Sequence, residues 1–204
     1  MKFWFLVGTI LASFSVKAEF LPKGFSAKFE QEYVSLLKGK NKKGSGSIDY
    51  SYPSNIRFET STPSQVIFVS NGKTNWYYRA PFIEGEAGEV TESAAKDGGS
   101  VYIKFFDSLK NGLTSNKLYD VGAEKDLSQR LSFKEKAAKD FGLKEAVLFF
   151  KSTKVRDFSN IVKIDLVFID GKKSTLSFSE LKVNPNFDAT KFQFIAPAGT
   201  RKSN

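Results

Sequence analysis

The chain has 204 residues, contains neither cysteine nor histidine, and carries a formal net charge of +9 at pH 7. Without cysteine a disulfide framework is excluded, and without histidine so are Ser-His-Asp catalysis, Cys-His catalysis and the common zinc sites. The length fits a single domain, whose core must hold the fold without covalent cross-links.

The first eighteen residues have the three parts of a secretory signal peptide. Lys2 provides a basic start, and an apolar stretch follows from 3 to 14. Val16 and Ala18 are small residues at the two positions that signal peptidase recognises before its cleavage site. The stretch is too short to span a membrane; a buried N-terminal helix is the alternative. We expect cleavage after Ala18, which leaves one domain, residues 19–204, outside the cytoplasm.

The domain stays basic after cleavage. Loss of Lys2 and Lys17 leaves 29 basic residues against 22 acidic ones, a net charge of +7. Nucleic acid is not expected as a partner, because the chain is exported and has no recognisable reading motif. An anionic membrane surface or an acidic protein fits better, and lysines that merely keep strands soluble explain the charge equally well.

Alternating apolar and polar residues, broken by Gly, Pro and Asn-Gly, predict one strand after another. The stretch 36–47 is expected to be a basic connection and 84–100 an acidic, glycine-rich loop. Residues 134–142 favour a helix, and Asp107-Ser108 a short helix ending at Gly112. The expected strands are 33–37, 48–52, 56–58, the hairpin 65–79, 101–105, 117–121, 127–133, 146–153, 160–169, 174–181 and 191–195.

The hairpin carries apolar residues on both of its faces. Asn71-Gly72 predicts a two-residue type I′ turn. Such a turn would place Phe68 opposite Asn75 and Val66 opposite Tyr77. We expect Val66, Phe68 and Tyr77 to point inward, and Ile67, Val69 and Trp76 to pack outward, beneath the 84–100 loop.

Ten or eleven strands with few helices predict a mainly β fold built on a single, strongly curved antiparallel sheet. A closed barrel would hold a ligand inside, whereas an open half-barrel would need short helices or loops as a lid. Because the chain contains 21 phenylalanines, the concave face would be a hydrophobic trough.

Several short motifs, taken in order, resemble those of the LolA family of periplasmic lipoprotein carriers. The resemblance spans nearly the whole domain and is weak only over 115–160. The motifs that carry it are FSAKFEQ (25–31), Gly44 and Gly46, Arg57-Phe58-Glu59, FVSNGKTNWYY (68–78) with APFIE (80–84), and DATKFQFIAPAG (188–199).

The resemblance implies an open half-barrel under a lid, with no enzymatic activity, no cofactor and no metal. Triacylated lipoproteins would be the cargo, released by an inner-membrane ABC transporter of the LolCDE type. They would pass to a LolB-type receptor lipoprotein of the outer membrane, and the carrier is expected to be a periplasmic monomer. Two features depart from the family: Tyr52 replaces the usual lid-locking Arg, and only 19–23 replace a full N-terminal helix.

Burial of acyl chains is strongly favourable, since each buried methylene is worth about 0.8 kcal/mol. A carrier must also release them, which favours a shallow, adaptable trough. The residues expected to bind acyl chains are Ile48, Tyr50, Tyr52, Ile56, Phe58, Val66, Phe68, Tyr77, Val101, Ile103, Phe105, Leu176 and Phe178.

Three other functions remain open at this point. The same fold would suit a periplasmic binder of another lipid or glycolipid, or a sensor that reads exposed lipid and relays the signal, although the chain has no second domain for a relay. The third function is an enzyme whose only catalytic groups are the carboxylates of Glu84, Glu86, Glu89 and Glu92. Acid-base catalysis, however, needs a positioned, desolvated pair of carboxylates.

Overall fold

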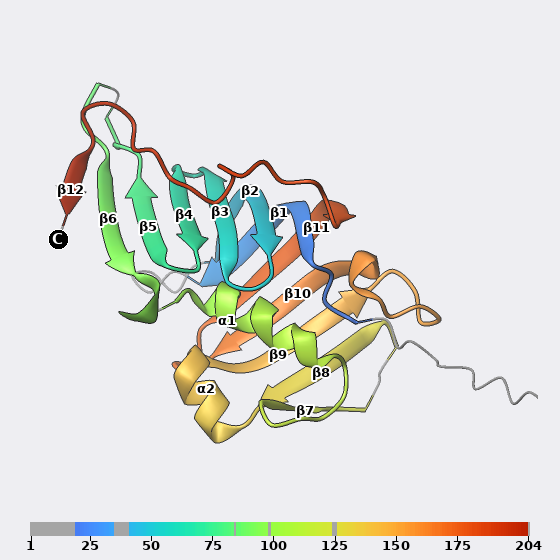
Figure 1. Ribbon diagram of the computed structural model, residues 1–204. Helices are drawn as coiled ribbons and strands as arrows, with labels where there is room; N and C mark the ends of the chain where they lie inside the picture. Colours follow the sequence, from blue (N-terminus) through green and yellow to red (C-terminus); the bar gives the residue numbers. More distant parts are fainter. Residues whose placement is uncertain (1–18, 35–40, 84, 98, 124–125, 204) are drawn as a thin grey trace, which may run out of the picture.

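A computed structural model describes residues 19–203 except 35–40, 84, 98 and 124–125 (Figure 1). The predicted signal peptide lies outside the described residues. Twelve strands form one curled sheet in the order β12-β6-β5-β4-β3-β2-β1-β11-β10-β9-β8-β7. The sheet does not close on itself, and two short α-helices accompany it (Figure 1). The predicted mainly β half-barrel is therefore confirmed.

All neighbouring strands pair antiparallel except β12 and β6, which are parallel. The strands are β1 (Gly24–Val34), β2 (Asn41–Ser51), β3 (Asn55–Thr62), β4 (Val66–Asn71), β5 (Thr74–Arg79), β6 (Glu89–Ala94), β7 (Tyr119–Val121), β8 (Ser128–Phe133), β9 (Leu143–Phe150), β10 (Ile161–Phe168), β11 (Lys173–Val183) and β12 (Arg201–Ser203). The helices are η1 (Ala95–Asp97), α1 (Val101–Ser108), η2 (Leu109–Asn111), α2 (Glu135–Phe141) and η3 (Phe158–Asn160).

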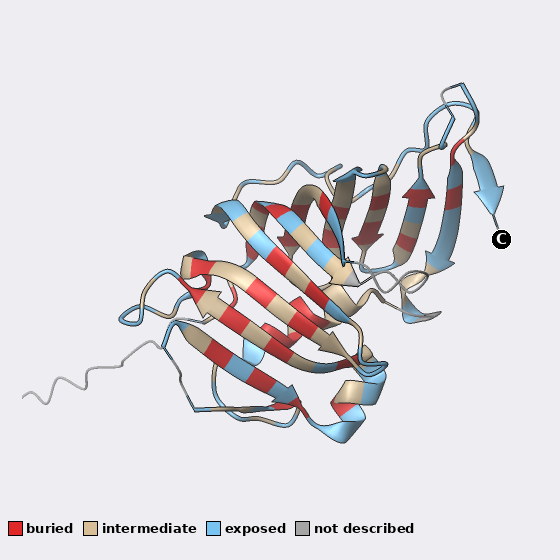
Figure 2. Cartoon of the chain, turned by 180° about the vertical axis from the view of Figure 1, so that it is seen from behind, coloured by how far each residue is buried: buried red, intermediate tan, exposed pale blue. Residues whose placement is uncertain are grey.

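The core lies on the concave face of the sheet. In β1, Phe25, Ala27 and Phe29 are buried there, while Lys28 and Glu30 on the opposite face are exposed. The same alternation colours the strands in bands in Figure 2. It follows from the two-residue period of a strand, which sends successive side chains to opposite faces.

The strand predicted over 101–105 is wrong, because this segment is helix α1. Val101, Phe105 and Leu109 recur every four residues, which fits a helix better than a strand. The Ser100 hydroxyl caps the helix by accepting a hydrogen bond from the Tyr102 amide at 3.2 Å. The expected helix end at Gly112 and the helix within 134–142 are both confirmed.

Several boundaries also differ from the sequence-based expectation. Strand β1 begins at Gly24 rather than near residue 33, and the expected connection 36–47 contributes its residues 41–47 to β2. The expected acidic loop contains β6, which pairs with β5. No strand forms over 191–195; the closing strand is β12 instead.

The β4–β5 hairpin has a longer loop than the predicted type I′ turn. Phe68 lies opposite Tyr77, and Ser70 opposite Asn75, so the register is two residues away from the expected one. The Asn71 side chain accepts hydrogen bonds from the amides of Lys73 and Thr74 at 3.0 and 2.8 Å, which stabilises the wider loop. A shift of two keeps every side chain on its expected face.

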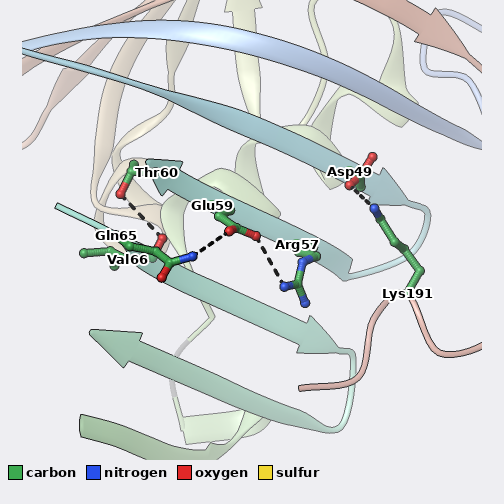
Figure 3. A network of polar contacts seen from close by, with 7 residues as sticks. All are labelled: Asp49, Arg57, Glu59, Thr60, Gln65, Val66 and Lys191. Carbon is green, nitrogen blue, oxygen red and sulfur yellow. Dashed lines mark hydrogen bonds and ion pairs between the residues drawn. The ribbon is translucent and has the colours of Figure 1, made fainter. Parts of the chain in front are cut away.

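The convex face carries a second, small apolar cluster made by Ile67, Val69, Tyr78 and Val90, with Trp76 against it. Its cover is the C-terminal segment rather than the 84–100 loop: the ring of Phe194 lies 5.4 Å from that of Tyr78. Lys191 of the same segment pairs with the buried carboxylate of Asp49 at 2.7 Å (Figure 3). The C-terminal segment thus fastens the outside of the sheet.

Candidate functional site

Helix α1 and the following η2, which we call the lid (Val101–Asn111), lie across the concave trough (Figure 1). The lid inserts an apolar face made by Ile103, Phe105, Phe106 and Leu109, all of them buried. The ring of Phe106 lies 4.9 Å from that of Phe25 and 5.5 Å from that of Tyr50, both on the sheet. The lid therefore fills the space that an apolar ligand would use.

Asp107 fastens the lid to the turn between β2 and β3. One carboxylate oxygen accepts hydrogen bonds from the Tyr50 hydroxyl at 2.5 Å and the Ser54 amide at 3.1 Å. The other accepts from the Ser54 hydroxyl at 2.8 Å. Burial, and next the hydrogen bond to Asp107, raise the pKa of Tyr50, so this phenol stays protonated and remains a donor.

Tyr102 fastens the middle of the lid to β1 and β11. The Gln31 side-chain amide donates hydrogen bonds to the Tyr102 hydroxyl and to the Ser174 hydroxyl, each at 2.9 Å. The ring of Tyr102 stacks on Phe58 with 4.8 Å between centroids and 11° between planes. Burial raises the pKa of Tyr102, and these polar contacts offset only part of the rise.

The far end of the lid is held by a third phenol and by a charge. The Tyr119 hydroxyl donates to the backbone carbonyls of Ser108 and Gly112 at 3.2 and 2.6 Å. Lys110 lies 5.2 Å above the ring of Tyr52 and pairs with Glu19. Tyr52 therefore meets the lid through its ring.

The residues expected to bind acyl chains fall into four groups in the structure. The first group is buried on the sheet: Ile48, Tyr50, Ile56, Phe58 and Leu176. The second group belongs to the lid itself: Val101, Ile103 and Phe105. The third group lies on the sheet and is half-buried or exposed: Val66, Phe68, Tyr77 and Phe178; the fourth is Tyr52 alone, which is exposed at the rim.

The sheet continues past the lid into β4, β5 and β6 (Figure 1). On its concave side Phe58, Phe68 and Tyr77 face one another across three strands. Phe68 is half-buried and Tyr77 is 37% exposed. The trough thus has a covered part under the lid and an accessible part beside it.

Sequence reasoning missed several residues of this site. Phe25 and Phe29 could have been found from their alternation in FSAKFEQ, had the strand been expected to start there. Phe106 and Leu109 would follow from a helical period over 101–109. No local pattern in the sequence predicts the polar contacts of Gln31, Tyr102 and Asp107, because these contacts join segments far apart in the chain.

The surface of the trough consists mainly of aromatic and aliphatic side chains. Within the described part of the chain, no group of three or more Asp or Glu side chains is placed to hold a metal ion. Among the described helices, none is long and apolar enough to cross a membrane. The trough presents an aromatic and aliphatic surface beneath the lid.

Comparison with known proteins gives consistent results. The family model "Outer membrane lipoprotein carrier protein LolA" matches residues 22–195. The outer-membrane lipoprotein carrier protein of Photobacterium profundum is 31% identical over 180 residues, which cover 88% of this chain and 82% of that protein. The corresponding protein of Vibrio parahaemolyticus is 29% identical over 181 residues, covering 87% and 77%. An uncharacterized conserved protein of Thermus thermophilus has a similar fold, with a TM-score of 0.50 at 12% identity over 90% and 92% of the two chains.

Proposed function

Because the chain belongs to the LolA family of outer membrane lipoprotein carrier proteins, we propose that it binds the acyl chains of triacylated lipoproteins in its concave trough and carries them from the inner to the outer membrane. One observation supports this proposal above others. The lid lies across the apolar concave face, and its own buried side chains are apolar occupants of the trough.

Exchange of the lid for cargo is energetically reasonable. An acyl chain would replace the side chains of Phe105 and Phe106 against the same apolar surface, so the apolar surface of the sheet would stay covered. Opening also breaks the polar contacts of Tyr50, Tyr102 and Tyr119, each of order 1 kcal/mol. A cover held in this way can be displaced and can return when the cargo leaves.

The route of the cargo is part of the same proposal. Export through the predicted signal peptide would put the carrier in the periplasm. There it would take lipoproteins from an inner-membrane ABC transporter of the LolCDE type and deliver them to a LolB-type receptor. The family description and the names of the relatives support lipoproteins as the cargo of this route.

Identification of the co-purifying ligand tests the function. The protein is purified from the periplasm, and mass spectrometry is expected to find triacylated lipoprotein bound one to one. Phe68→Glu should reduce the bound lipoprotein about tenfold or more, because it puts a carboxylate on a surface that acyl chains must desolvate. Ile83→Glu is the matched control: Ile83 is 62% exposed on the β5–β6 loop, outside the trough.

The outcome separates the carrier from its alternative. A free phospholipid or glycolipid, bound one to one and lost in the Phe68 variant, would replace the lipoprotein carrier by a carrier or sensor of another lipid. Equal loss in the Phe68 and Ile83 variants would show that the trough is not the binding surface.

A further inference from the structure

A cavity of about 260 Å³ opens beside the trough, where β1, β2, β3 and β4 meet. None of its lining residues is charged, although the chain contains 31 Lys and Arg residues. Four other cavities formed by described residues each include at least one Lys or Arg. The lining of the uncharged cavity is Gln31, Tyr33, Gly44, Thr60, Thr62, Pro63, Ser64 and Val66.

The cavity offers hydroxyls and carbonyls rather than charges. The Thr60 hydroxyl lies 3.3 Å from the carbonyl of Ser64 and 3.4 Å from that of Val66 (Figure 3 shows the second contact). The Thr62 hydroxyl lies 2.8 Å from that of Ser45. Neutral donors and acceptors of this kind suit esters and amides, whereas a phosphate or carboxylate there would lack a cationic partner.

Gln31 belongs both to this cavity and to the attachment of the lid. Its side-chain nitrogen has two protons, and both are donated, one to Tyr102 of the lid and one to Ser174. A carbonyl group entering the cavity would compete for these protons. Occupation of the cavity would then loosen the contact that holds the middle of the lid.

We propose that this cavity receives the ester and amide groups that join acyl chains to the first residues of a lipoprotein, and that Gln31 couples its occupation to release of the lid. This inference rests on the proposed carrier function. It adds a polar subsite that distinguishes an acylated peptide from a bare hydrocarbon chain.

Two probes test the subsite in the mature protein: a tripalmitoylated cysteinyl-serine peptide and hexadecanol, each measured by displacement of an apolar dye. Ser64→Asp should weaken binding of the peptide about tenfold and leave hexadecanol within about twofold. Ser61→Asp is the matched control, because Ser61 is exposed near the end of β3, three residues from Ser64, and does not line the cavity. Equal effects on both probes, or none on the peptide, would overturn the subsite. A wild-type protein that binds neither probe would overturn the carrier function itself.

The coupling has its own readout. Because the chain lacks cysteine, spin labels can be placed through Asn111→Cys on the lid and Lys28→Cys on the sheet, and their distance measured by electron resonance. At the same fractional saturation, the peptide should shift the distance further than hexadecanol, because only the peptide can also compete for the protons of Gln31. Gln31→Met, which keeps the side-chain length and removes both donors, should shift it without any ligand. Identical distances in the Gln31 variant and the wild type would refute the coupling.

Discussion

Replacement of Asp107 by alanine is expected to free the lid and to lower the free energy of unfolding by about 3 kcal/mol. The carboxylate accepts three hydrogen bonds from Tyr50 and Ser54. Water can replace those to Ser54, which is half-buried, but the Tyr50 side chain is fully buried. A buried donor left without an acceptor costs about 1–3 kcal/mol by itself. Urea unfolding measures the loss, and hydrogen exchange of the amides over 101–108 measures the opening.

Two variants show whether the effect comes from this contact. Asp107→Asn keeps an acceptor oxygen for Tyr50 and should lose about half as much stability. Asp140→Ala removes an exposed carboxylate of α2, close to the lid, that accepts no hydrogen bond from the described residues. It should change stability by less than about 0.5 kcal/mol. A comparable loss in Asp140→Ala would mean that general charge, not the bonds to Tyr50 and Ser54, holds the lid.

The sheet was predictable from the sequence because its signal is local. Alternation such as Ile48, Tyr50 and, across the turn, Ile56, Phe58 fixes which face of each strand is buried. The faces expected in the β4–β5 hairpin were right even though its register was not, since the error was two residues. The alternation of apolar residues therefore predicts the buried face of each strand even where the turn type is predicted wrongly.

The lid was not predictable in this way. Val101, Ile103 and Phe105 alternate like a strand over five residues, while Phe106 and Leu109 complete a helical pattern only over nine. The contacts of Asp107 and Gln31 depend on residues 53 and 71 positions away along the chain. Such long-range pairs become visible only when the sheet has brought β1, β2 and the lid together.

Alkaline pH is expected to unfold the protein steeply, because three buried phenols contact the lid or belong to it. Burial, followed by the hydrogen bond to Asp107, raises the pKa of Tyr50, and burial likewise raises the pKa of Tyr102 and of Tyr119. In the unfolded chain all three would lose their protons near pH 10. The folded chain then binds up to three more protons, so their contribution to stability is complete below about pH 10 and is lost as the pH rises further.

The slope of this loss identifies the phenols. Each contributes about 1.4 kcal/mol per pH unit once the unfolded chain is deprotonated, or about 4 kcal/mol per unit together. Urea unfolding between pH 9 and pH 11 measures the slope. Tyr119→Phe should reduce it by about one third, because it removes one titrating group and its bonds to Ser108 and Gly112 while the aromatic core remains. An unchanged slope would show that Tyr119 ionises equally in both states. Since all three hydroxyls lie at the lid, hydrogen exchange of the amides over 101–108 should accelerate at a lower pH than that of the amides in β1. Such a difference would link the alkaline transition to the element that covers the trough.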